Sequence, residues 1–314
     1  MLGVAGIAVL AIVETVAALL APGRAPTDAD WRAAAAAVRA EFRFGDLIVA
    51  APAWADPLLR LHLGDLIPIP VAARMDDARY GRVWEIGQRG AHVVGPGVDT
   101  TAAGTPPRIA VEARFGALTV RRIERPAAEV TFDFLERWTE ATVTEVTSGR
   151  SGGAAPCPWL GDRFACPGGG PTVHRELVEV DTRIRRALLA PPPHAPGGRL
   201  IVAFPAVPLG RELVVAAGLH DVWARKLATG QARLEVFVGD VRVGDVEIGN
   251  RSGWRLLTFD TSRLAVTDPV VFPALAPALA GNASRPPATL PVRFEISSTR
   301  PELRHLAFAA EARR

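Results

Sequence analysis

The second half of the chain is a series of short segments in which every other residue is apolar. From Val130 onward these segments are bounded by glycine, proline, aspartate or asparagine, and they include "RLEVFVGDVRVGDVEIG", "GWRLLTFDTS" and "VRFEISS". A period of two places successive side chains on opposite faces of a strand, and short strands separated by turns are typical of antiparallel sandwiches and barrels. We therefore predict an antiparallel β-sandwich of jelly-roll type over residues 130–314.

The alternation also predicts which side chains of this sandwich face its core. The predicted core residues are Val236, Val238, Val246, Ile248, Leu257, Phe259, Phe294 and Ile296. The residues between them are predicted to face outward, and they include Glu235, Phe237, Glu247, Thr258 and Glu295. Phe237 is the apolar exception in that outward set, so its surroundings test for a binding surface. Val238-Gly239-Asp240-Val241 predicts a tight hairpin turn between two strands.

The N-terminus is an apolar run from Leu2 to Ala21 with one charged side chain, Glu14. At about 1.5 Å per residue, a helix of this length crosses a hydrocarbon core of about 30 Å. We expect residues 1–22 to be a transmembrane anchor; a cleaved signal sequence and a buried helix are the alternatives. Arg24 and Arg32 follow the run, and by the positive-inside rule they favour a cytoplasmic location for the rest of the chain.

The two cysteines, Cys157 and Cys166, lie in "APCPWLGDRFACPGG". An isolated pair in a loop rich in proline and glycine predicts one disulfide. Two buried thiols, or a zinc site with His174 as a further ligand, are the alternatives. Because disulfides persist in oxidising compartments, the pair outweighs the positive-inside rule. We predict a bacterial inner-membrane protein whose soluble part lies in the periplasm.

Residues 28–126 predict a small α/β domain, so that the chain as a whole is α+β. A helix starting at Asp28 or Asp30, which can act as its N-cap, is followed by the strand "DLIVAA", the helix "ADPLLRLHLGDL" and the strand Gly81–Gly87. Two strands then occupy Ile109–Arg125, with a break at Phe115-Gly116. No G-x-G-x-x-G lies between the first strand and the next helix, which argues against a dinucleotide-binding unit.

Two resemblances follow from these segments. The stretches "DWRAAAAAVRAEFRFGDLIVAAPAW", "YGRVWEIG" and "ARFGALTVRRIER", after a membrane span, resemble the extracytoplasmic tail of bacterial dolichyl-phosphate-mannose mannosyltransferase-like membrane glycosyltransferases. That resemblance carries no catalytic residue across, and it implies an accessory or degenerate piece of a lipid-linked-sugar glycosyltransferase system. The C-terminal half resembles a galactose-binding-like or carbohydrate-binding jelly roll, which implies a glycan ligand.

Four residues are the candidate ligand site. Trp223 and Trp254 are candidate platforms, because sugars stack on exposed tryptophan faces; the alternative is that each fills the sandwich core. Arg225 and Asn250 can supply planar hydrogen bonds to hydroxyl groups or to a carboxylate, and the neighbouring Arg251 can do the same; the alternative is that these are solvated loop residues. The sequence offers no cofactor motif, and no two of its six histidines have metal-ligand spacing, so neither a metal nor a cofactor is expected.

Charge argues against nucleic-acid binding, because the net charge is only +3 and the arginines are interspersed with acids. Lys226 is the only lysine, which is typical of a GC-rich bacterial genome. We predict a membrane-anchored, non-catalytic periplasmic protein that binds a glycan or a partner protein. The alternative is the accessory glycosyltransferase component, with a multi-span glycosyltransferase as its partner. A glycosidase is less favoured, because it needs two carboxylates across one cleft.

Overall fold

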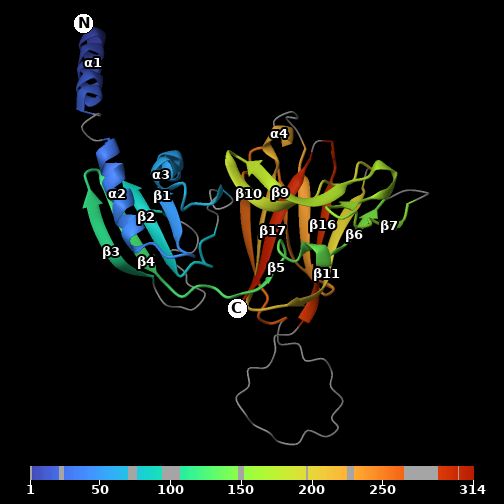
Figure 1. Cartoon of the computed structure of the whole chain (residues 1–314). Coiled ribbons are helices and arrows are strands. Elements are labelled where there is room, and N and C mark those ends of the chain that lie inside the picture. The colour runs from blue at the N-terminus through green and yellow to red at the C-terminus, as the bar shows by residue number, and fades with distance from the viewer. Residues whose placement is uncertain are drawn as a thin grey trace, which may run out of the picture. The chain divides into compact units, whose positions relative to one another are not determined.

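The structure is a computed structural model of residues 1–314, in which the chain divides into two compact units (Figure 1). The first unit comprises Met1–Pro68 and Asp76–Ala127, and the second comprises Ile69–Met75 and Ala128–Arg314. The structure describes residues 2–20, 25–69, 76–93, 107–147, 152–195, 197–224, 230–264, 289–302 and 304–314.

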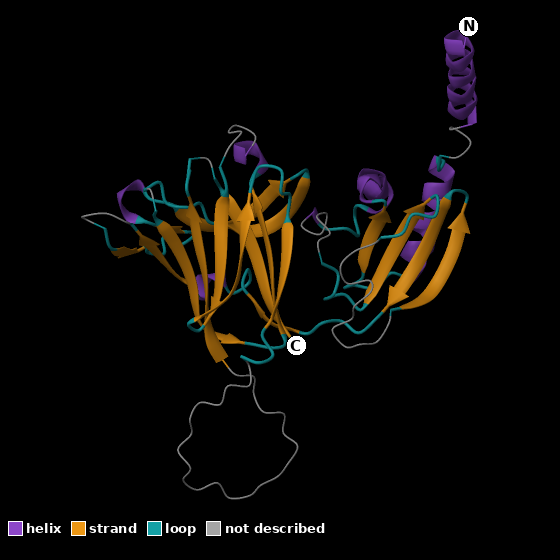
Figure 2. Cartoon of the chain, turned by 180° about the vertical axis from the view of Figure 1, so that it is seen from behind, coloured by secondary structure: helices purple, strands orange, loops and turns teal. Residues whose placement is uncertain are grey.

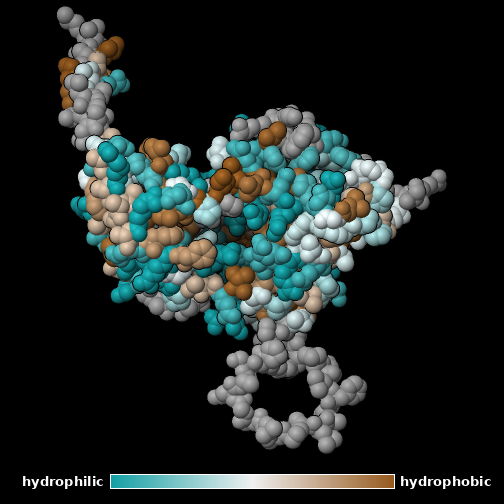
Figure 3. All heavy atoms as spheres, viewed as in Figure 1, coloured by the Kyte–Doolittle hydropathy of each residue, from teal (hydrophilic) through white to brown (hydrophobic). Residues whose placement is uncertain are grey.

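The N-terminal apolar run forms helix α1, Leu2–Leu20. Its described apolar side chains are exposed, among them Ile7, Leu10 and Val13, and Figure 3 shows brown patches of hydrophobic residues on this helix. Within the described ranges, no helix combines the length and the apolar character that a membrane crossing requires. The transmembrane anchor over residues 1–22 stays a prediction.

Helix α2, Asp28–Glu41, begins earlier than either predicted cap, Asp28 or Asp30, implies. Its N-cap is Thr27, whose hydroxyl accepts a hydrogen bond from the Asp30 backbone N–H at 3.2 Å, while the Asp30 carboxylate accepts one from the Thr27 N–H at 2.8 Å. The prediction that Asp28 or Asp30 is the N-cap was wrong, because Asp30 completes a capping box from the third helical position. The buried face of α2 consists of Trp31, Ala34, Ala35 and Val38.

The first unit is a four-stranded sheet with helices α2 and α3 packed on it. Its remaining elements are β1 (Leu47–Ala51), a 3-10 helix (Ala53–Ala55), α3 (Asp56–Leu63), β2 (Arg82–Gln88), β3 (Arg108–Phe115) and β4 (Leu118–Glu124). The strand order is β1-β2-β4-β3, with β1 parallel to β2 and the other pairs antiparallel. This is the predicted order of a helix, a strand, a second helix, a strand and a hairpin.

The second unit contains two antiparallel sheets, which Figure 2 shows from behind. One sheet has the order β15 (Arg255–Asp260), β12 (Glu212–Leu219), β17 (Leu306–Arg313), β10 (Arg183–Leu189), β9 (Thr172–Val180) and β8 (Phe164–Ala165), with β5 (Val130–Asp133) also paired to β17. The other has the order β14 (Val241–Ile248), β13 (Ala232–Val238), β16 (Thr289–Ser298), β11 (Arg199–Pro208), β6 (Thr142–Val146) and β7 (Ala154–Pro156). A short helix, α4 (Asp221–Ala224), and two 3-10 helices (Trp138–Glu140 and Pro167–Gly169) join these strands.

Both sheets bury side chains in one core, so the predicted antiparallel sandwich is confirmed. The jelly-roll designation stays a prediction. Three aromatic residues link the sheets at the centre, because the Phe134 ring lies 4.8 Å from that of Phe204 and 5.3 Å from that of Phe294 in edge-on contacts. The predicted core residues behave as expected: Val236, Val238, Ile248, Phe294 and Ile296 are at most 1% exposed, and Val246, Leu257 and Phe259 pack against them.

The outward-facing positions depart from expectation at Glu295 and Phe237. Glu295 is only 5% exposed although it lies on the outer face, because Arg199 and Arg293 place nitrogens 3.0 and 2.9 Å from its carboxylate. The Arg293 guanidinium also lies 4.0 Å above the Phe237 ring. Phe237 is therefore half-buried beneath the guanidinium of Arg293. It lies on β13, whereas Trp254 directly precedes β15, a strand of the other sheet, so the two rings form no common aromatic platform.

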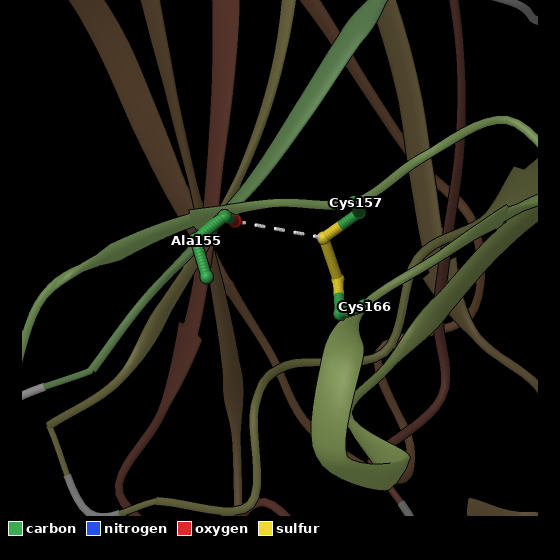
Figure 4. The surroundings of a disulfide bond; sticks show 3 residues. All are labelled: Ala155, Cys157 and Cys166. Carbon is green, nitrogen blue, oxygen red and sulfur yellow. Dashed lines mark hydrogen bonds between the residues drawn. A yellow bond between two sulfur atoms is a disulfide. The ribbon is translucent and has the colours of Figure 1, made fainter.

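The predicted disulfide between Cys157 and Cys166 is confirmed (Figure 4). Both cysteines are buried, and their Cα atoms lie 4.1 Å apart. The loop that they close carries Trp159, which packs on the Phe164 ring at 5.0 Å and on Trp138 at 4.8 Å. The covalent link thus holds a small aromatic cluster at the side of the sandwich.

We predict that Phe294→Ala lowers the free energy of unfolding by about 3–5 kcal/mol, because it opens a cavity among the aromatic rings that join the two sheets. Phe237→Ala removes the same side chain from the outer face, and it should cost only about 1–2 kcal/mol. Urea unfolding followed by circular dichroism measures both values. Equal losses from the two variants would show that the inner and outer faces have been assigned wrongly.

Candidate functional site

A cavity of about 300 Å³ lies where three connections of the sandwich meet, and we call it the loop cavity. The connections are the tip of the β9–β10 hairpin, the start of α4, and the segment between β14 and β15. Its volume is at the lower end of the range for small-molecule sites. The residues that line it are Val180, Asp181, Leu219, Asp221, Gly249, Asn250, Arg251 and Gly253.

The hairpin tip is held over the loop cavity by the carboxylate of Asp221. Its oxygens accept hydrogen bonds from the backbone N–H groups of Asp181, at 2.8 Å, and Thr182, at 3.4 Å. Both tip residues have positive φ angles, 51° and 62°, a conformation that aspartate tolerates better than most residues. Because Asp221 is itself buried, these charge-assisted bonds replace the water that its carboxylate loses.

Asn250 is positioned by a buried arginine behind it. The side-chain oxygen of Asn250 accepts a hydrogen bond from the guanidinium of Arg304, which also donates to the Gly230 carbonyl at 3.5 Å. Arg304 is fully buried. Burial lowers the pKa of its guanidinium, and the charge of Glu302 opposes that shift. The amide of Asn250 is therefore fixed in orientation before any ligand arrives.

Trp254 follows Gly253 at the edge of the loop cavity and is half-buried. Its indole N–H donates to the Arg183 carbonyl at 3.0 Å, so the ring is tied to the same hairpin as the tip. The ring packs toward Gly218, where a Cβ atom would come within 3.2 Å of the indole and within 2.9 Å of the Val180 side chain. Glycine at position 218 thus leaves room for the indole against the sheet.

The structure brings two of the four predicted site residues to one place. Asn250 lines the loop cavity, and Trp254 directly follows Gly253 of the lining and packs against the cluster that includes Val180, another lining residue. Trp223 belongs to α4, shortly after Asp221 of the cavity wall, but its side chain lies outside the described part of the chain. Arg225 lies outside the described residues.

Sequence reasoning missed the two acidic residues of the site, Asp181 and Asp221. The dipeptide Asp181-Thr182 between two alternating segments signalled a turn, but nothing in the sequence showed that this turn meets Asp221, which is 40 residues away. Arg251, which the sequence suggested beside Asn250 as a hydrogen-bonding residue, is an exposed residue of the cavity lining.

The loop cavity presents hydrogen-bonding groups of both kinds. Carboxylates accept, the Arg251 guanidinium donates, and an amide such as that of Asn250 has atoms of each kind. No group of three histidine, cysteine, aspartate or glutamate residues within the described ranges is arranged to hold a metal ion. Positive and negative side chains share the lining, so this surface suits a polar ligand without a strong net charge.

No protein-family model and no curated protein matches the chain. Among solved structures, the CBM51-2 and INT domains of Clostridium perfringens ZmpB are 8% identical and match 55% of this chain and 37% of that one, with a TM-score of 0.31. The M60 catalytic domain with the CBM51-1 and CBM51-2 domains of the same protein is 8% identical and matches 66% of this chain and 20% of that one, also at 0.31. The chain thus spans well under half of either structure. A likeness this weak establishes no shared ligand, and no match supports the mannosyltransferase-like resemblance.

We predict that Asp221→Ala lowers the free energy of unfolding by about 1–3 kcal/mol, because it removes the acceptor of two backbone N–H groups at the hairpin tip. Asp221→Asn keeps one side-chain oxygen in place and should lose less. Chemical denaturation of the two variants measures the difference. An Asp221→Ala protein as stable as the wild type would refute the tethering role of this carboxylate.

Proposed function

We propose that the protein is a non-catalytic glycan-binding protein of the cell envelope, and that the loop cavity holds the sugar. The observation that carries this proposal is the convergence of Asp181, Asn250 and Arg251 on one small cavity beside an indole. Each sugar hydroxyl both donates and accepts a hydrogen bond, so it pairs with carboxylate, amide and guanidinium groups alike. Tryptophan supplies an apolar face for the C–H groups of the sugar ring.

The rigidity of the lining supports the same proposal. The site is fixed from behind by Arg304 on Asn250, and from the side by Asp221 on the hairpin tip. Groups that are already oriented lose little conformational entropy when a ligand binds, so a few hydrogen bonds suffice for recognition. A volume of about 300 Å³ favours recognition of a single sugar unit, such as the end of a glycan, over a long stretch of chain.

A second role, docking on a partner protein, is favoured by one observation in the first unit. Trp54, Leu58 and Leu61 are 69%, 42% and 74% exposed, and their spacing of four and three residues places them on one face of the α3 region. Leu59 and Leu63 fill the core from the opposite face. Exposed apolar patches of this kind mark interaction surfaces. A photo-crosslinker at Leu61 that captured a multi-span glycosyltransferase would favour the accessory role over glycan binding.

We predict that the full chain binds at least one class of glycan on an array, and that Arg251→Ala and Trp254→Ala weaken that binding at least tenfold, by about 1.4 kcal/mol. Arg251 is exposed on the cavity rim, so its loss should leave the fold intact. Trp159→Ala is the matched control, because Trp159 is a partly exposed tryptophan that does not line the cavity. An array without signal, or equal weakening in the Trp159 variant, would refute the proposal.

We further propose that the sandwich unit lies in the periplasm and that α1 holds the chain at the inner membrane. The support is the buried disulfide, which an oxidising compartment preserves, and the exposed apolar side chains of α1. A C-terminal alkaline phosphatase fusion should be active and a green fluorescent protein fusion dark, with both chains retained in the membrane fraction after carbonate washing. The reverse pattern of fusion activities would place the sandwich in the cytoplasm.

A further inference from the structure

Three of the other five histidines, although far apart from it in the sequence, lie within electrostatic reach of His305. His174, His194 and His220 are all close enough for their charges to act on the imidazole of His305. The carboxylate of Glu176 acts on it too, and that carboxylate lies 3.3 Å from the His174 ring. Several titratable side chains of the sandwich therefore act electrostatically on one imidazole, that of His305.

The sheet register brings two of these histidines face to face. Strands β12 and β17 pair from Glu212 and Arg313 to Leu219 and Leu306, and the next pair in that register is His220 and His305. The His220 N–H donates to the His305 carbonyl at 3.0 Å, so the ladder does continue to this pair. Opposite residues of an antiparallel pair project from the same face, and like charges in such positions repel.

Each histidine of this pair is joined by one peptide bond to a residue that builds the loop cavity. His220 precedes Asp221, whose carboxylate holds the hairpin tip. His305 follows Arg304, whose guanidinium orients Asn250. Any separation of the two strand ends therefore moves both supports of the loop cavity at once.

Protonation opposes the closed arrangement of the pair. Burial is the main effect that lowers the pKa of His305, and the charge of His220 lowers it further. Glu176 raises it, while His194 and His174 add smaller lowering effects. Because the ordinary histidine pKa is about 6.5, below that pH the opened form takes up a proton that the closed form does not. Acidification thus favours opening, and the closed form is fully favoured above that pH.

A further titratable group, Glu145, interacts with His194, but it belongs to strand β6 of the other sheet and not to the strands that lead to the His220–His305 pair. Burial raises the pKa of Glu145 from 4.5, and His194 opposes that shift. A carboxyl group with a raised pKa favours the folded form as pH falls from that raised pKa toward the ordinary value of 4.5, so Glu145 acts in the opposite sense to the histidine pair. Arg304 and Glu302, on the segment that leads to His305, are of opposite charge.

We propose that the His220–His305 pair is a pH-sensitive latch, which keeps the loop cavity closed around neutral pH and opens it in mildly acidic conditions. Release of a bound glycan on acidification follows from this latch, and that consequence alone rests on the proposed function. The latch itself is a property of the sandwich and is testable without a ligand.

The test is amide hydrogen exchange of the full chain, read at the His220 N–H, which the closed latch protects. After correction for the intrinsic exchange rate, we expect protection of this N–H to fall about tenfold between pH 7.5 and pH 5.5. This is the change that results when one histidine, with an ordinary pKa of about 6.5, takes up a proton only in the open form. His305→Gln should abolish most of this fall. His62→Gln is the control, because His62 stacks on Trp31 in the first unit, and it should leave the fall unchanged.

Protection that is independent of pH in the wild type, or that falls equally in His305→Gln, would overturn the latch. A titration of the His305 ring by nuclear magnetic resonance in the wild type needs no variant, and a midpoint at or above 6.5 would also overturn it. Glycan affinity measured over the same pH range separates the two proposals. A tenfold fall in protection without any glycan binding would sustain the latch and refute the glycan site.

Discussion

The C-terminal strand β17 is the element on which the rest of the sandwich depends. It pairs with β5, β10 and β12 in one sheet, and all eight of its residues are buried. Its Phe308 ring meets that of Phe294 at 4.8 Å, so the same strand contacts the opposite sheet. A strand that is buried on both faces must carry apolar side chains or charged side chains that pair with each other. Most residues of β17 are accordingly apolar, with alanine the commonest, and its two charged residues, Glu311 and Arg313, form an ion pair at 2.6 Å.

Arginine also accounts for the buried carboxylate of Glu295 on the outer face of the other sheet. Glu295 is held between Arg199 and Arg293, and its planar partners donate from both sides of the outer face. A buried ion pair of this kind adds little net stability, but removing one partner leaves an uncompensated charge and is costly. The nearly exclusive use of arginine over lysine, whatever its genomic cause, thus suits a sandwich whose outer faces carry ion-paired acids.

Periodicity predicted the sandwich and its core well, because burial of one strand face is a local consequence of alternation, as at Val236 and Val238. It failed where a neighbouring strand decides the outcome: Glu295 faces outward yet is covered by arginines from β11 and from its own strand. The site was found only in part for the same reason. Asn250 stood out in its loop, whereas the meeting of Asp181 with Asp221 depends on how a hairpin tip folds back, which no local pattern encodes.

The core and the loop cavity are stabilised by different interactions, so the loop cavity can open while the core stays packed. The core rests on apolar burial around the phenylalanine rings, whereas the cavity rests on hydrogen bonds at strand ends, which are the places where local opening costs least. The buried guanidinium of Arg304 also favours opening of the loop cavity. Its charge is penalised by burial in the closed form, so opening at the adjacent His305 returns a guanidinium to water as well as allowing an imidazole to take up a proton. Hydration of the guanidinium and protonation of the imidazole both favour the open form, and the effect of protonation grows as pH falls. Acid therefore acts on the loop cavity while the sandwich stays folded.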